Sequence, residues 1–200
     1  MLRDEFLSLA MKHGGTQSTA ELWWAEVESH YREEHRRYHT LEHLAEMLDL
    51  LRGESDAVLA AMWFQDVIYD RRGSNEERSA DVAREALTDL QFPRATIDLV
   101  ERLILATKTH APGDLPPETH VLLDADLAIL GAPRERYERY IEGVRYEYSW
   151  VPEAMFRAGR AGVLRAFAEK EQIFLTAAMH ERFEETAREN LAWELDGIED

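Results

Sequence analysis

Apolar residues recur at helical spacing along almost the whole chain, and this periodicity is the feature that most constrains its fold. No stretch alternates apolar and polar residues between hairpin turns, the pattern typical of a half-buried β-strand. The prolines fall between the periodic segments or at their first positions, where a missing backbone N–H costs least. The sequence therefore predicts an all-α fold.

The periodic segments predict about ten helices in a single-domain helical bundle that spans residues 1–200. A chain of 200 residues fits one compact domain. The expected helices are Arg3 to Lys12, Ser18 to Glu34, Leu41 to Leu51, Ser55 to about Phe64, Asn75 to Leu90, Arg94 to Ala106, Pro117 to Leu130, Arg134 to Tyr148, Pro152 to Ala168 and Gln172 to Leu195.

Composition narrows the class of protein. With 45% hydrophobic and 32% charged residues, the chain is expected to be globular and soluble. No apolar run approaches the roughly 18 residues of a membrane span, and the N-terminus lacks the features of a signal peptide. We expect a cytoplasmic protein without a membrane partner. Because the chain contains no cysteine, any metal must be bound by His, Asp or Glu.

The net charge of −17 argues against nucleic acid as a partner, because non-specific binding to nucleic acid depends on Lys and Arg side chains that neutralise phosphates. A small phosphorylated substrate is still compatible with this charge, since a bound divalent cation can invert the local field of an acidic protein. The oligomeric state is left open by the sequence.

The apolar run that starts at Ala57 ends in Gln65 and Asp66, so both side chains are expected to enter the interior with it. A buried carboxylate without a compensating partner is very costly. Asp66 therefore needs a cation or a set of hydrogen-bond donors.

Two other segments carry polar residues among apolar ones. His39 and His43 are four residues apart, which on a helix puts them on one face, although such a pair by itself is more often a surface or satisfied core pair. Asp124 and Asp126 interrupt an otherwise apolar stretch of ten residues. Positions two apart on a helix diverge by about 200°, so one acid is expected to be a ligand and the other structural.

A lone buried aspartate is commonly a helix cap or the partner of an arginine. Three such features in one chain, with only imidazole and carboxylate as ligands, favour a divalent metal instead. The metal would supply the compensation that Asp66 requires.

The segments RRYHTLEH, AMWFQDVIYD, NEERSA, LDADLAILG and VRYEYSWVPEAMFRAGRAGVLRAF resemble a bacterial group of predicted phosphohydrolases in the HD superfamily, which is metal-dependent. The matching segments run from about Glu34 to Leu195. The resemblance implies an HD-type helical bundle and hydrolysis of a small phosphorylated metabolite, with nucleotides the first candidate.

The resemblance also implies roles for single residues. YHTLEHL is similar to the YHNxxHA segment of cyclic-nucleotide phosphodiesterases, which implies that His43 binds metal and that His39 contacts phosphate or acts as general acid. Asp66 matches the acid of the His-Asp doublet. ADLA resembles the final-ligand motifs of those phosphodiesterases and of alarmone hydrolases, which places the last ligand at Asp126, with Asp124 as the rival.

Gln65 departs from the superfamily, because it stands where the defining histidine is expected. A neutral amide is a poor ligand for transition metals, so metal affinity should be weakened, with Mn²⁺ or Mg²⁺ favoured over Fe, Co, Ni or Zn, or the site left empty. A natural active variant, a natural degenerate enzyme and a deliberate His-to-Gln replacement all fit this residue.

The implied mechanism is metal-assisted hydrolysis of a phosphoester. A metal bound by His43, Asp66 and Asp126, with Gln65 as a weak fourth ligand, would acidify a bound water, and Asp66 or Asp124 would orient that water. His39 would protonate the leaving oxygen. The expected substrate contacts are Arg37, Lys108 and His110.

Two other functions compete with this one. The first is a catalytically degenerate HD-fold protein that binds a nucleotide or a metal without turnover. The second is a helical interaction protein without a ligand site.

Overall fold

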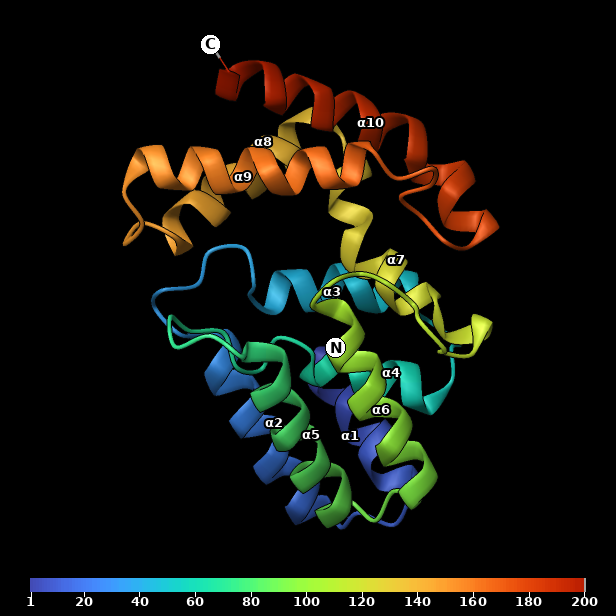
Figure 1. Ribbon diagram of the computed structural model, residues 1–200. Coiled ribbons are helices and arrows are strands. Elements are labelled where there is room, and N and C mark those ends of the chain that lie inside the picture. The colour runs from blue at the N-terminus through green and yellow to red at the C-terminus, as the bar shows by residue number, and fades with distance from the viewer. Residues whose placement is uncertain (200) are drawn as a thin grey trace. The chain divides into compact units, whose positions relative to one another are not determined.

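The computed structural model describes residues 1–199, and within that range the chain forms ten α-helices, two 3-10 helices and no β-strand (Figure 1). The predicted all-α fold is confirmed. No helix in the described range is both long enough and apolar enough to cross a membrane.

The chain divides into two compact units. The first contains residues 1–34 and 39–122, and the second contains residues 35–38 and the chain from 123 onward. Helix α7 (Val121–Leu127) starts in the first unit and ends in the second. That all 200 residues form one domain stays a prediction.

The first unit is built around helix α4 (Asp56–Phe64), whose residues from Ala57 onward are buried except for Leu59. Aromatic rings surround it, since Phe6 and Trp24 each lie within 6.0 Å of the Trp63 ring, measured between centroids. A helix that is apolar all round belongs in a protein core. The residues that follow its C-terminal end therefore begin in the interior of the unit.

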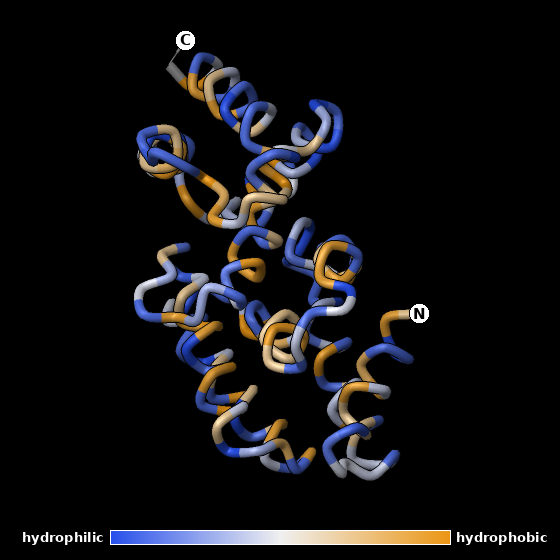
Figure 2. The backbone as a smooth tube through the Cα atoms, turned by 90° about the vertical axis from the view of Figure 1, so that its right-hand side faces the viewer, coloured by the Kyte–Doolittle hydropathy of each residue, from blue (hydrophilic) through white to orange (hydrophobic). Residues whose placement is uncertain are grey.

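The other helices of this unit cover α4. Helix α1 packs on α2, and α5 lies beside α6, which also packs on α4 (Figure 1). Most of these helices carry apolar and polar positions side by side along the tube, as expected of helices with one buried face (Figure 2). Their bounds are α1 (Leu2–Lys12), α2 (Gln17–Tyr31), α3 (Leu41–Leu50), α5 (Asn75–Asp89), α6 (Arg94–Thr107) and the 3-10 helix η1 (Pro117–Thr119).

The second unit contains the 3-10 helix η2 (Ala128–Gly131), α8 (Arg134–Glu147), α9 (Glu153–Ala168) and α10 (Ala177–Glu199). Helix α10 packs on η2 and on α9. A Cβ added to Gly131 would lie 2.7 Å from Phe183 of α10, so only glycine permits this close approach.

Two of the predicted helices differ markedly from the structure. The helix expected from Pro117 to Leu130 is split into η1, α7 and η2, and Asn190 accounts for its end, because its amide donates to the carbonyls of Leu130 and Ala132. The last helix begins at Ala177, not at Gln172. Carboxylates accept the backbone N–H groups of residues 173–176 and so hold that segment outside the helix.

Candidate metal centre

His43 is fixed by the first turn of α3. Thr40 caps this helix, since its hydroxyl accepts the backbone N–H of Glu42 at 3.3 Å. The side chain of His43 is buried, with 2% of its surface exposed. His39 precedes the helix, so the two histidines do not share a helical face, yet their ring centroids are 5.9 Å apart. The backbone turn before α3, rather than helical spacing, brings them together.

Asp66 follows the C-terminal end of α4, and its Oδ2 lies 3.7 Å from Nε2 of His43. This separation is longer than a normal hydrogen bond. It is close to the roughly 3–3.5 Å between two ligand atoms that share one ion at metal–ligand distances of about 2.1 Å. The C-terminus of a helix also carries partial negative charge, which favours a cation there. The two atoms are close enough that one metal ion could bind both of them.

Gln65 is buried next to this pair. Its Nε2 lies 3.4 Å from Nε2 of His43 and 3.0 Å from Sδ of Met47. An amide nitrogen can only donate a hydrogen bond, so in this arrangement Nε2 of His43 is the acceptor. A metal would need the same imidazole lone pair. Gln65 would therefore compete with a metal for His43.

The segment that follows Asp66 is anchored to α5. Ser79 is buried, accepts the N–H of Ile68 at 3.0 Å and donates to its carbonyl. The side-chain amide of Asn75 bonds both the N–H and the carbonyl of Asp70. Asp70 in turn forms two hydrogen bonds of 2.9 Å with the guanidinium of Arg78. These contacts fix the backbone on the C-terminal side of Asp66.

The ion pair between Asp70 and Arg78 predicts a stability change in acid. The guanidinium of Arg78 lowers the pKa of Asp70 from 3.8 to about 2. A depressed folded-state pKa gives stability that is fully present above pH 4 and is lost as the pH falls towards 2. Because both side chains are about one-third exposed, we expect Asp70→Asn to cost about 1 kcal/mol or less at pH 6.

Urea unfolding of the wild type and of Asp70→Asn at pH 6, 4 and 3 measures this difference. It should shrink steadily between pH 4 and 3. A difference that stays constant with pH would show that the pair contributes through packing and not through charge.

The two acids of α7 have different surroundings. Asp124 is fully buried, and its carboxylate accepts the N–H groups of Leu175 and Thr176 and the hydroxyl of Thr176, each at 2.7 Å. It holds the segment in front of α10. Asp126 is partly exposed and belongs, like Asp124, to the second unit.

The predicted substrate contacts lie in different elements. Arg37 stacks its guanidinium over the ring of Tyr146, 4.2 Å from the centroid. Lys108 directly follows the last residue of α6 and forms an ion pair with Glu77, which raises the pKa of the lysine. His110 follows α6 in the left-handed backbone region, with φ of 49°.

Two residues near these candidates were not among the predicted site residues. The ring of Tyr69 stacks on His39 with centroids 4.1 Å apart. Glu147 of α8 is buried and accepts the backbone N–H groups of Arg37 and Tyr38, at 2.7 and 2.8 Å. It therefore holds the backbone directly before His39. The only sequence signal for it is an acid on the otherwise apolar face of α8.

Within the first unit, His43 and Asp66 offer an imidazole nitrogen and a carboxylate oxygen, two groups that could bind a divalent metal ion. The first unit alone fixes the contact between His43 and Asp66. In comparisons with protein-family models, with curated proteins and with solved structures, nothing matches this chain.

Proposed function

We propose that this protein is a metal-dependent phosphohydrolase of the HD type, acting on a small phosphorylated metabolite, with a nucleotide as the first candidate. The observation that carries the proposal is the buried His43 held 3.7 Å from Asp66 at the carboxyl end of a buried helix. The resemblance of the segments around these residues to the HD superfamily supports the same assignment.

The chemistry of the donor set fits a divalent ion. His43 supplies an imidazole and Asp66 a carboxylate, and the resemblance of ADLA to the final-ligand motifs adds the carboxylate of Asp126 as the last ligand. Asp124 is the poorer candidate for the last ligand, because three donors already engage its oxygens. With Gln65 in place of an imidazole, the set is rich in oxygen, which favours Mn²⁺ or Mg²⁺ over softer ions.

Each side chain then has a defined role in the reaction. When bound, the ion neutralises charge on the phosphoryl group and acidifies a water molecule. Asp66 orients the attacking water as well as binding the ion. His39, whose ring is positioned by Tyr69, donates a proton to the leaving oxygen. Arg37 lies two residues before His39 and can clamp a phosphate oxygen.

A degenerate binding protein is the second candidate, and the position of the Gln65 amide favours it. An amide donor that points at Nε2 of His43 lowers the affinity for metal. Such a protein would hold a nucleotide or a metal without turnover.

Metal analysis of protein purified without chelator, followed by a phosphatase screen, tests the proposal. We expect hydrolysis of p-nitrophenyl phosphate or of nucleoside monophosphates with Mn²⁺ or Mg²⁺, and weaker or no activity with Co²⁺ or Ni²⁺. His43→Ala and Asp66→Asn should remove both activity and bound metal while the helical circular dichroism is kept.

Asp49→Asn is the matched control, because it neutralises an exposed acid on α3 and should change neither property. Metal binding without turnover would favour the degenerate protein. Unchanged metal content in His43→Ala and in Asp66→Asn would contradict both functions.

A further inference from the structure

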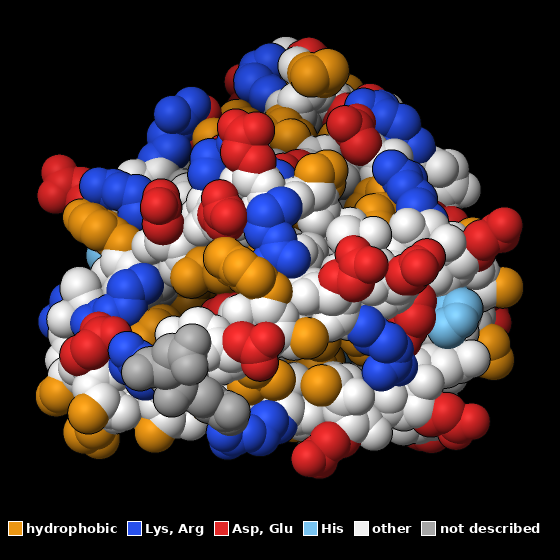
Figure 3. Space-filling model, turned by 90° about the horizontal axis from the view of Figure 1, so that it is seen from above, with side chains coloured by type: hydrophobic (Ala, Val, Ile, Leu, Met, Phe, Trp, Pro, Cys, Tyr) orange, Lys and Arg blue, Asp and Glu red, His pale blue; other side chains and the backbone are white. Residues whose placement is uncertain are grey.

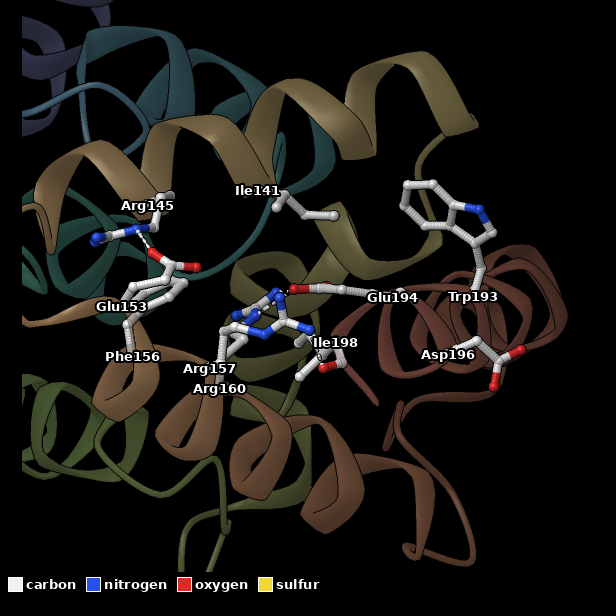
Figure 4. Close-up of a pocket in the computed structure, with 11 residues that line it drawn as sticks. Ile141, Arg145, Glu153, Phe156, Arg157, Arg160, Trp193, Glu194, Asp196 and Ile198 are labelled. Carbon is white, nitrogen blue, oxygen red and sulfur yellow. Dashed lines mark hydrogen bonds and ion pairs between the residues drawn. The ribbon is translucent and has the colours of Figure 1, made fainter. Parts of the chain in front are cut away.

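A groove of about 510 Å³ lies between α8, α9 and α10 in the second unit (Figure 4). Its apolar walls come from all three helices and include Ile141, Phe156, Trp193 and Ile198. Small-molecule sites commonly have about 300–1,000 Å³ and mostly apolar walls with a few polar groups. The groove has the size and the lining of such a site, and none of its residues belongs to the metal centre proposed above.

The centre of the groove is a buried ion pair. Arg160 is 10% exposed and Glu194 5%, and two hydrogen bonds of 2.7 and 2.9 Å join them. Tyr137 donates to Glu194, and Arg160 donates to Tyr140. Burial alone would lower the pKa of Arg160, but its tyrosine and glutamate neighbours outweigh this and raise it. These charges compensate one another and leave no net charge for a ligand.

A second pair at the edge of the groove is also compensated, since Arg145 bonds Glu153 at 2.9 Å. Arg157 differs. Its guanidinium donates to the backbone carbonyl of Ile198, and among residues 1–198, whose side chains the structure describes, it makes no ion pair with a carboxylate (Figure 4). A guanidinium has five N–H donors in a planar fork. Arg157 therefore keeps donors and a positive charge beside apolar walls.

We propose that this groove binds a small monocarboxylate with an apolar body, whose carboxylate pairs with Arg157. The fork of a guanidinium matches a carboxylate with two parallel hydrogen bonds. Phe156 and Ile141 would contact the apolar body. Asp196 also lines the groove and would repel a second negative charge, which selects a monoanion over a phosphate.

The charge pattern of the face seen in Figure 3 does not favour a nucleic acid as a partner. The face shown in Figure 3 carries acidic and basic side chains interspersed rather than a field of one sign. A nucleic acid would require a continuous basic surface.

Calorimetric titration of the full-length protein with 4-phenylbutyrate, indole-3-propionate and octanoate tests the proposal. We expect saturable binding with one site per chain, and the ranking of the three probes distinguishes an aromatic from an aliphatic body. The neutral amide of 4-phenylbutyrate should bind at least about tenfold more weakly, because it lacks the charge-assisted pair.

Arg157→Gln should weaken 4-phenylbutyrate binding by about tenfold or more, whereas Arg139→Gln, an exposed arginine on α8 outside the groove, should leave it unchanged. Ile141→Trp should block binding by filling the groove. Circular dichroism checks that each variant is folded.

Equal affinity in Arg157→Gln and wild type, or no saturable binding of any probe, would overturn the proposal. Self-association of the wild-type protein that disappears in Ile141→Trp would also overturn the proposal, since a second copy of the chain would then occupy the groove.

Discussion

Replacing Gln65 by histidine is expected to raise the affinity for Mn²⁺ by about ten- to a hundredfold and to raise phosphatase turnover with it. The substitution has two effects on the same site. It removes the amide donor 3.4 Å from Nε2 of His43, and it adds an imidazole where a weak neutral ligand stood. Isothermal titration with Mn²⁺ and initial rates at saturating metal measure the two effects separately.

Gln17→His is the matched control, because it adds a histidine at the exposed first position of α2. It should change neither metal affinity nor turnover. Adding Asp66→Asn to Gln65→His should return both to the background level. If Gln65→His gains neither metal nor activity while staying folded, then His43 and Asp66 are not ligands and the proposed function fails.

The fold class could be predicted because helical periodicity is a local property that persists through almost every segment. The boundaries near residue 130 and before α10 could not. Asn190 ends the helix near Leu130 through contacts 58 and 60 residues away in sequence. The helix start at Ala177 depends on Asp124, about 50 residues earlier. Such long-range hydrogen bonds leave no periodic signal.

For the candidate site, too, some features could be predicted from the sequence and others could not. The apolar run of α4 predicted that Gln65 and Asp66 would both enter the interior, and the structure buries Gln65 but leaves 21% of the Asp66 side chain exposed. The close pair of His39 and His43 was predicted from helical spacing, whereas a backbone turn produces it. The contact of Gln65 with Met47 and that of Glu147 with the backbone before His39 needed the tertiary structure.

The two acids of α7 are expected to respond in opposite ways to the same substitution. Asp124→Asn should lower the free energy of unfolding by about 2–4 kcal/mol, because a buried charged acceptor with three donors is replaced by an amide whose NH₂ group faces a donor. Asp126→Asn should cost less than about 1 kcal/mol, as is usual for a partly exposed side chain. Urea unfolding in the presence of chelator measures both values without a contribution from metal.

Metal titration should rank the two variants in the opposite order, because the variant that loses less stability is expected to lose the metal. Asp126→Asn is expected to lose Mn²⁺ binding in the Gln65→His background, whereas Asp124→Asn should keep it at temperatures where the protein remains folded. Side chains two positions apart on a helix diverge by about 200°, so one of these acids can face the anchored segment before α10 while the other faces elsewhere. Loss of metal in Asp124→Asn with retention in Asp126→Asn would therefore assign the final ligand to Asp124, and would require that the segment before α10 give up its three hydrogen bonds when metal binds.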